Sequence, residues 1–295
     1  MWTRRSFLQT SIYATAAVPL VRAGDSTKPL VGSQLYGWGQ YYRREGKKLE
    51  ENLDEAFSAL RDAGYDYAEH GLSTDPEANV RLGDRLKGKG LRPVSLYTGG
   101  TFHEDKAADA EIERLITGAR GAKEAGFWLI NCNPDPIGRA KTDAELNTQA
   151  RSLNAFGQRL REMGMQLGIH NHTPEMQNDA KEFHHNLRET KPDDVGFCYD
   201  VHWVFRGGLS PEVVLPLYGS RVVSWHLRQS RDRIWWEDLD TGDVDYALVA
   251  KYAQSHHLAP LYTVELAIED GTKITRSVVE NHARSRKFVR QVFNV

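Results

Sequence analysis

The chain has 295 residues, of which 40% are hydrophobic, and its 38 lysines and arginines nearly balance its 40 aspartates and glutamates. This balance argues against a nucleic-acid partner, which usually leaves an excess of basic residues, and the hydrophobic content argues against disorder. A chain of this length buries a large core without disulfides. We therefore expect Cys132 and Cys198, each within an apolar run, to be buried free thiols rather than a bridge.

Residues 1–23 have the features of an export signal. A twin arginine, Arg4-Arg5, precedes a weakly apolar stretch at 11–21 that is too short to span a membrane. The segment resembles a twin-arginine (Tat) signal, with a signal-peptidase site after Ala23. We therefore predict an exported, periplasmic protein without stable membrane insertion after cleavage, whose mature domain covers residues 24–295.

After this segment, short apolar runs alternate with longer amphipathic runs, and glycines at 64, 90, 126 and 164 end four of the helices. The apolar runs predict strands at 31–37, 65–70, 91–97, 127–132, 165–171, 195–200, 222–227 and 261–266. The clearest helices are expected at 49–63, 211–218, 244–256 and 275–292. Strands alternating with helices imply parallel pairing, and eight units predict a single α/β domain, a (β/α)₈ TIM barrel.

Polar side chains follow these apolar runs, at the strand carboxyl ends where such barrels place their active sites. Imidazole and carboxylate groups occur at the ends of strands two, five, six, seven and eight, namely Glu69, His70, His170, His172, Asp200, His202, His226 and Glu265. Ligands of this mixed type suit Mn²⁺, Mg²⁺, Co²⁺ or Zn²⁺ with open positions for substrate oxygens. The sequence therefore predicts one divalent metal ion at the mouth of the barrel.

Two runs of sequence, at 168–175 and 195–204, resemble the xylose-isomerase-like TIM-barrel superfamily, and the resemblance extends over essentially the whole mature chain. Its members include sugar phosphate isomerase/epimerase-like enzymes, inosose dehydratases and metal-dependent apurinic endonucleases. The resemblance implies metal ligands at Asp200, His226 and Glu265. The glutamate that relatives commonly carry after strand five is replaced by His170, as in a branch with a His-Asn-His motif. Either His170 becomes the fourth ligand, or Glu175 reaches back into the site.

The resemblance further implies a divalent-metal-dependent isomerase or epimerase that acts through an enediolate on a sugar or keto-sugar. Glu265 and His172 are candidates for proton transfer, and Glu69 is a third catalytic candidate that holds substrate hydroxyl groups. Further substrate-binding candidates are His103, Trp203, Arg228 and His202. Since the missing glutamate is one of two acid/base carboxylates in epimerases, a lyase or hydratase acting on 3-keto-glycosides stays open as an alternative.

Aromatic residues support a carbohydrate substrate. Five tryptophans lie at or just beyond the predicted strand ends, where they either stack on sugar faces or pack long loops, namely Trp38, Trp203, Trp225, Trp235 and Trp236. The loop at 229–243 is long for its position and is a candidate cover for the site. A DNA-repair endonuclease and a non-catalytic periplasmic sugar-binding protein are the alternatives from other classes. Assembly into a homo-oligomer is left open.

Overall fold

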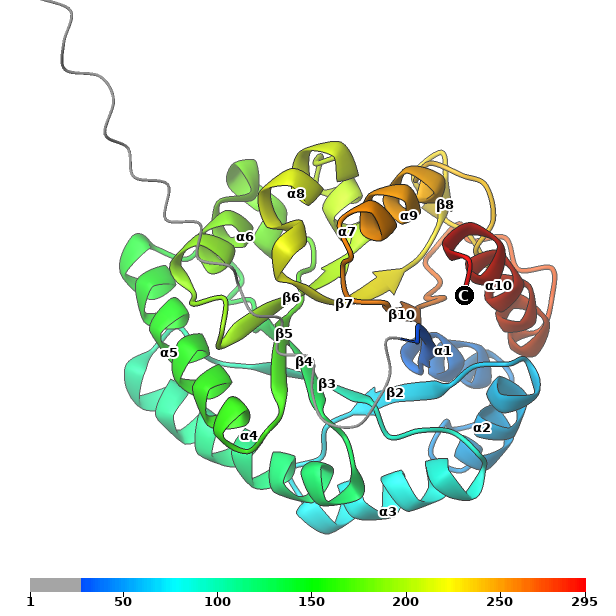
Figure 1. Ribbon diagram of the computed structural model, residues 1–295, viewed down its shortest axis with the longest axis horizontal. Helices are drawn as coiled ribbons and strands as arrows, with labels where there is room; N and C mark the ends of the chain where they lie inside the picture. Colours follow the sequence, from blue (N-terminus) through cyan, green and yellow to red (C-terminus); the bar gives the residue numbers. More distant parts are fainter. Residues whose placement is uncertain (1–27) are drawn as a thin grey trace, which may run out of the picture.

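The computed structural model describes residues 28–295, so the predicted export signal lies outside the described residues (Figure 1). Parallel strands close into a barrel in the order β1-β10-β7-β6-β5-β4-β3-β2, which confirms the predicted (β/α)₈ fold. These strands are β1 Leu30–Gln34, β2 Tyr67–Gly71, β3 Ser95–Gly100, β4 Leu129–Pro134, β5 Gln166–Ile169, β6 Val195–Asp200, β7 Val222–Leu227 and β10 Leu261–Val264.

Helices surround the barrel (Figure 1). They are α1 Tyr36–Arg44, α2 Leu53–Asp62, α3 Pro76–Gly88, α4 Asp105–Ala125, α5 Asp143–Glu162, α6 Gln177–Glu189, α7 Val201–Arg206, α8 Pro211–Tyr218, α9 Tyr246–Ser255 and α10 Val278–Phe293. Short 3₁₀ turns occur at Pro174–Met176 and Gly219–Arg221. A small antiparallel hairpin, β8 Ser230–Arg231 with β9 Ile234–Trp235, lies within the long loop after β7.

The predicted bounds hold for β6, β7 and α8, and shift by a few residues elsewhere. The predicted strand at 91–97 begins only at Ser95, since Pro93 has no amide hydrogen to donate to a ladder. The predicted first strand ends early because Gly37 already belongs to α1, where it lies against the backbone of Leu266. Gly64, Gly90, Gly126 and Gly164 all have positive φ angles, as expected at helix ends.

The core is divided along the barrel axis. At the amino-terminal ends of the strands, a small apolar cluster of Tyr67, Val94, Leu129 and Leu261 fills the interior. The main core packs between the strands and the helices around them. Because these apolar residues fill the barrel at the amino-terminal ends of its strands, most polar side chains of the interior lie toward the carboxyl ends. Cys132 and Cys198 are buried and free, as predicted.

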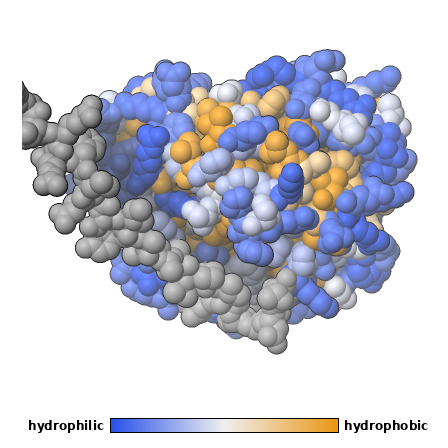
Figure 2. All heavy atoms as spheres, turned by 45° about the horizontal axis from the view of Figure 1, so that its top comes forward, coloured by the Kyte–Doolittle hydropathy of each residue, from blue (hydrophilic) through white to orange (hydrophobic). Residues whose placement is uncertain are grey.

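The described surface is largely hydrophilic, with apolar side chains interspersed on the face that Figure 2 turns forward. Val213 and Leu217 of α8 are among the exposed large apolar residues. Within residues 28–295, none of the helices combines the length and the apolar character needed to cross a membrane.

The close packing of α4 against the first residue of α3, Pro76, generates a stability prediction. A Cβ atom at Gly121 would lie 2.1 Å from the carbonyl oxygen of Pro76, whereas one at Gly88 would meet nothing within 4 Å. We expect Gly121→Ala to lower the free energy of unfolding by about 1–3 kcal/mol, because backbone atoms must move apart. Gly88→Ala is the matched control and should be neutral or slightly stabilising. Equal stability of the two variants in urea unfolding would contradict this packing.

Candidate metal centre

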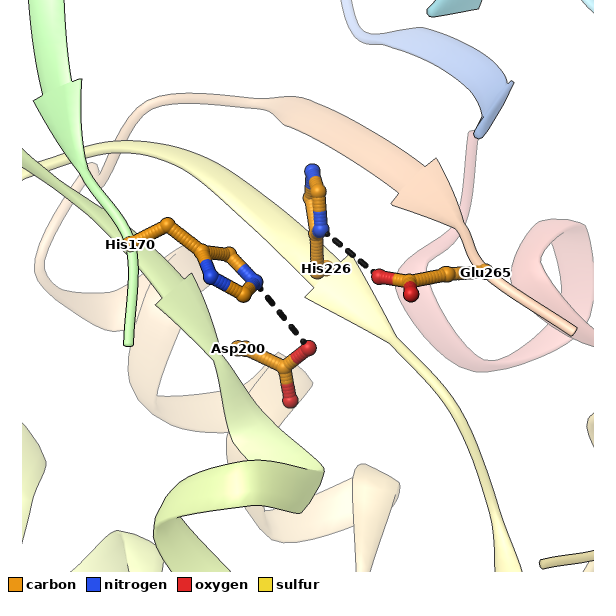
Figure 3. Close-up of side chains that lie close together, drawn as sticks. All are labelled: His170, Asp200, His226 and Glu265. Carbon is orange, nitrogen blue, oxygen red and sulfur yellow. Dashed lines mark hydrogen bonds and ion pairs between the residues drawn. The ribbon is translucent and has the colours of Figure 1, made fainter. Parts of the chain in front are cut away.

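Four side chains converge at the carboxyl ends of neighbouring strands (Figure 3). His170 directly follows β5, Asp200 ends β6, His226 lies in β7, and Glu265 directly follows β10. Each offers one ligand atom, and these atoms all lie within 4.8 Å of one another. All four residues are buried. The side chains predicted to bind a metal are thus brought together by the barrel, with His170 in the fourth position.

Strand register explains the convergence. Asp200 is paired with His226 across β6 and β7, and Thr263 of β10 is paired with His226 from the other side. Asp200 also caps α7, because its Oδ1 accepts a hydrogen bond of 2.7 Å from the amide of Trp203. This bond fixes the carboxylate so that its second oxygen, Oδ2, faces Nε2 of His170 at 3.4 Å.

The charges of the cluster suit a cation. Burial alone would raise the pKa of Asp200, but the contacts with His170 and Arg228 outweigh burial and lower it. Burial likewise opposes ionisation of Glu265, whose pKa is nevertheless held low by Arg228 and His226. Both carboxylates are therefore ionised at neutral pH, in a site with little contact with water.

Three buried atoms of these four residues have no hydrogen-bond partner, namely Nε2 of His170, Oδ2 of Asp200 and Nε2 of His226. Leaving such atoms unpaired costs about 1–3 kcal/mol each, so buried polar groups in proteins nearly always have a partner. Two imidazole nitrogens and two carboxylates without sulfur are a donor set for Mn²⁺, Co²⁺ or Zn²⁺. The residues present therefore fit a divalent cation.

His172 stands beside the cluster on the solvent side and is only half-buried. Its ring lies edge-on to that of His170, with 4.7 Å between centroids, and edge-on to Trp203 at 5.5 Å. Burial, followed by the proximity of His170, lowers the pKa of His172 to about 3. Its imidazole is therefore neutral at physiological pH.

Arg228 forms one wall of the site. Its Nη2 is 2.5 Å from Oε1 of Glu265, and its Nη1 is buried without a hydrogen-bond partner. The guanidinium lies 4.1 Å from the ring centroid of Trp235 and 5.4 Å from that of Trp203. Trp235 belongs to the β8–β9 hairpin, so the long loop after β7 does contribute to the wall of the site, as its length suggested.

The structure places Glu69 behind the cluster rather than at its mouth. Its carboxylate is fully buried and is contacted by Ser95, Asn131 and His226. Burial would raise the pKa of Glu69, but these partners, chiefly His226, lower it. Oε2 is bound by Ser95 and Asn131, and Oε1 faces Nε2 of His226 at 2.9 Å, so the carboxylate is directed at His226 from behind rather than toward the mouth of the barrel.

Glu175 also lies away from the four-residue cluster, because Oε2 accepts a hydrogen bond of 2.8 Å from the amide of His172. The alternative in which Glu175 replaces His170 is therefore not the arrangement found. Its carboxyl group is buried near the ion pair between Lys141 and Glu182, and it shapes the turn that presents His172.

The remaining candidate residues lie outside the four-residue cluster, some beside it and others in the core. His202 is buried in α7 with its ring 6.4 Å from that of Trp235, and burial followed by Arg228 lowers its pKa to about 3. His103 is buried beyond β3, with Nε2 3.6 Å from Glu104, and is not part of the cluster. Trp38 and Trp225 are fully buried core residues, which excludes sugar stacking in this conformation.

Sequence reasoning missed the polar residues behind the cluster, namely Ser95, Tyr97, Asn131, Asn133 and Ser224. Ser95 and Tyr97 alternate on β3, and Asn131 and Asn133 alternate on β4. Residues two apart on a strand share a face, so polar residues at period two inside an apolar strand were the available signal.

The protein is thus an α/β barrel with a buried cluster of imidazole and carboxylate groups at the carboxyl ends of its strands. The sequence profile of the xylose isomerase-like TIM barrel family matches residues 57–288, so the chain belongs to that family.

Individual relatives agree with this assignment. An inosose dehydratase of Geobacillus kaustophilus (strain HTA426) is 24% identical over 226 residues, covering 71% of this chain and 70% of the relative. A sugar phosphate isomerase/epimerase of Parabacteroides distasonis shares the fold with a TM-score of 0.73 at 22% identity, covering 95% of this chain and 98% of that structure. D-allulose 3-epimerase of Methylomonas sp., solved with D-allulose, gives a TM-score of 0.70 at 18% identity, covering 90% and 98%.

The burial of Glu175 generates a prediction for pH dependence. Burial, against the opposing hydrogen bond from His172, raises the pKa of Glu175 from 4.5 to about 7. Between these values the folded protein keeps a proton that the unfolded chain has lost, so stability falls as the pH rises through this window. We expect Glu175→Gln to exceed the wild type by about 1–3 kcal/mol at pH 8 and to match it near pH 4.

The measurement is the free energy of unfolding from urea titrations across pH 4–8. Glu124→Gln, which changes an exposed glutamate of α4, is the matched control and should leave the profile unchanged. Parallel profiles for Glu175→Gln and the wild type would show that Glu175 titrates normally.

Proposed function

We propose that this protein is a divalent-metal-dependent isomerase or epimerase that acts through an enediolate on a sugar or keto-sugar. The observation that carries the proposal is the cluster of His170, Asp200, His226 and Glu265, in which three buried nitrogen or oxygen atoms have no hydrogen-bond partner. Family membership and the epimerase fold neighbours support the same chemistry. Mn²⁺, Mg²⁺, Co²⁺ and Zn²⁺ are the candidate ions.

The cation, when bound, polarises a substrate carbonyl and lowers the pKa of the neighbouring C–H group. His172 is the proposed proton acceptor, because it is neutral, half-buried and adjacent to His170. The negative charges of Glu265 and Asp200 offset part of the effect of burial, because both raise the pKa of His172 and so favour the imidazolium formed in this step. General acid–base catalysis of this type contributes about 10²–10⁴-fold to a rate.

Glu265 is the second proposed acid/base group and is also a ligand. Its carboxylate is ionised and is oriented by Nη2 of Arg228 at 2.5 Å and by Nδ1 of His226 at 2.9 Å. Return of the proton to the neighbouring carbon gives isomerisation, and return to the opposite face gives epimerisation. Nη1 of Arg228, which has no protein partner, is the proposed donor to a substrate oxygen. Trp203 and His202 complete the proposed substrate wall.

A lyase or hydratase acting on keto-sugars is the second candidate. The specific support is the similarity to inosose dehydratase, together with His170 in place of the glutamate that relatives carry after strand five. In such a reaction the enediolate expels a leaving group from the adjacent carbon instead of regaining a proton. The same residues serve the first step, so the fate of the intermediate distinguishes the two candidates.

The proposal includes a location for the enzyme, and it is weighed against a role in sugar binding alone. We propose that residues 1–23 direct export by the Tat route, so that the enzyme acts on carbohydrate in the periplasm; the twin arginine and the short apolar stretch support this. A role as a sugar-binding protein without catalysis gives no reason for two ionised carboxylates and two imidazoles to meet in one buried cluster.

Metal dependence is tested at Asp200. Asp200→Asn retains an oxygen that accepts from the amide of Trp203, so the cap of α7 survives while the charge is lost. We expect the affinity for Mn²⁺ to fall at least tenfold with little change in melting temperature, and Asp200→Ala to lose metal and stability together. Asp194→Asn, at a carboxylate paired with Arg161, is the control. Full metal content in Asp200→Ala, by elemental analysis, would show that the proposed site is wrong.

The enediolate is tested by solvent exchange. Incubation in D₂O with ketoses, inososes and 3-keto-glycosides should place deuterium on a substrate carbon, because proton abstraction precedes every outcome. Proton NMR and mass spectrometry then separate a deuterated isomer from a dehydrated product, which decides between isomerase and lyase. His172→Gln should slow exchange about 10²-fold or more. Lack of C–H exchange across the whole panel would falsify the mechanism.

A further inference from the structure

Each imidazole of the metal centre has one ring nitrogen inside the cluster and the other against a buried polar group behind it. For His226, Nδ1 faces Oε2 of Glu265 at 2.9 Å and Nε2 faces Oε1 of Glu69 at 2.9 Å. For His170, Nε2 faces Oδ2 of Asp200 at 3.4 Å and Nδ1 faces the hydroxyl of Tyr97 at 3.4 Å. The two histidines therefore point opposite nitrogens into the cluster.

The group behind His226 can only accept a hydrogen bond. Oε2 of Glu69 receives hydrogen bonds of 2.7 Å from the Ser95 hydroxyl and from the side-chain amide of Asn131. The Asn131 amide is itself oriented, because its carbonyl oxygen accepts from the Ser224 hydroxyl at 3.0 Å. Oε1 of Glu69 faces Nε2 of His226 at 2.9 Å. Because a carboxylate has no proton to donate, a hydrogen bond between these two atoms requires the proton to be on Nε2 of the imidazole.

The group behind His170 is an acceptor for a different reason. The Tyr97 hydroxyl donates its single proton to the side-chain oxygen of Asn133. Asn133 is oriented in turn, because its amide nitrogen donates to the carbonyl of Pro134 at 3.3 Å. Having used its proton, the Tyr97 oxygen offers only lone pairs to His170, which favours a proton on Nδ1 and a lone pair on Nε2.

We propose that Glu69 and Tyr97 are positioning residues that fix opposite tautomers of the two histidines, so that Nδ1 of His226 and Nε2 of His170 are the ligand atoms. This inference rests on the proposed metal dependence. A ligating imidazole needs its outer N–H held by a partner, and loss of that partner typically weakens metal binding about 10–100-fold. Glu69 thereby acts through His226 without touching the substrate.

The test compares Mn²⁺ dissociation constants, measured by calorimetry, in the wild-type protein and matched variants. Glu69→Gln keeps one oxygen for Ser95 and Asn131 but turns an NH₂ group toward Nε2 of His226, and should weaken binding about 10–100-fold. Tyr97→Phe should weaken it only a few-fold, because the contact with His170 is long. The controls remove similar buried groups elsewhere, at Glu237→Gln beside Thr275 and at Tyr67→Phe beside Thr263, and should leave the constant within twofold.

A spectroscopic measurement separates positioning from a general loss of structure. In the Zn²⁺-loaded wild-type protein, long-range ¹H–¹⁵N spectra should show a proton on Nε2 of His226 and on Nδ1 of His170. Opposite tautomers would overturn the proposal even where a variant fails to fold. Unchanged Mn²⁺ affinity in folded Glu69→Gln would overturn the role of Glu69 while leaving metal dependence intact. Absence of metal binding by the wild type would overturn both this inference and the proposed function.

Discussion

The pairing of charges in a nearly dry barrel mouth is the constraint on which the rest of the site depends. Glu69, His226, Glu265 and Arg228 form a continuous series of contacts in which each carboxylate faces an imidazole or a guanidinium group. An isolated buried carboxylate would take up a proton rather than remain charged. Because every carboxylate here has a cationic or hydrogen-bonding neighbour, the site keeps ionised ligands at a depth where water contributes little.

The barrel supplies this pairing through its register, and that part could be predicted from the sequence. Parallel strands bring their carboxyl ends to one rim, so Asp200, His226 and Glu265 had to be neighbours once the strands were located. Their strands were located because apolar runs and helix-ending glycines such as Gly126 and Gly164 repeat along the chain. The candidate metal centre thus follows from position along the strand, without knowledge of any side-chain conformation.

The direction in which each side chain points, and its depth in the barrel, could not be predicted in the same way. Glu69 follows an apolar run just as Glu265 does, yet it points below the cluster toward Ser95 and Asn131, whose partnership joins three strands. Trp38 and Trp225 lie near strand ends like Trp203, but pack into the core instead of the mouth. Such differences depend on the tilt and depth of each strand in the closed barrel, which a linear pattern of apolar and polar residues does not contain.

Charge balance links the unusual His170 to the proposed chemistry. Histidines bind a cation in their neutral form. In that form, the three negative charges of Glu69, Asp200 and Glu265 would be balanced by Arg228 and one divalent cation. A fourth carboxylate in place of His170 would leave this group of residues with a negative excess that opposes enediolate formation. With His170, transfer of a proton from carbon to His172 creates an imidazolium and an enediolate together, so the site stays neutral through the step. With His170, the site therefore has one acid/base carboxylate fewer. In return, the negative charge that develops on the substrate is balanced by positive groups in contact with it.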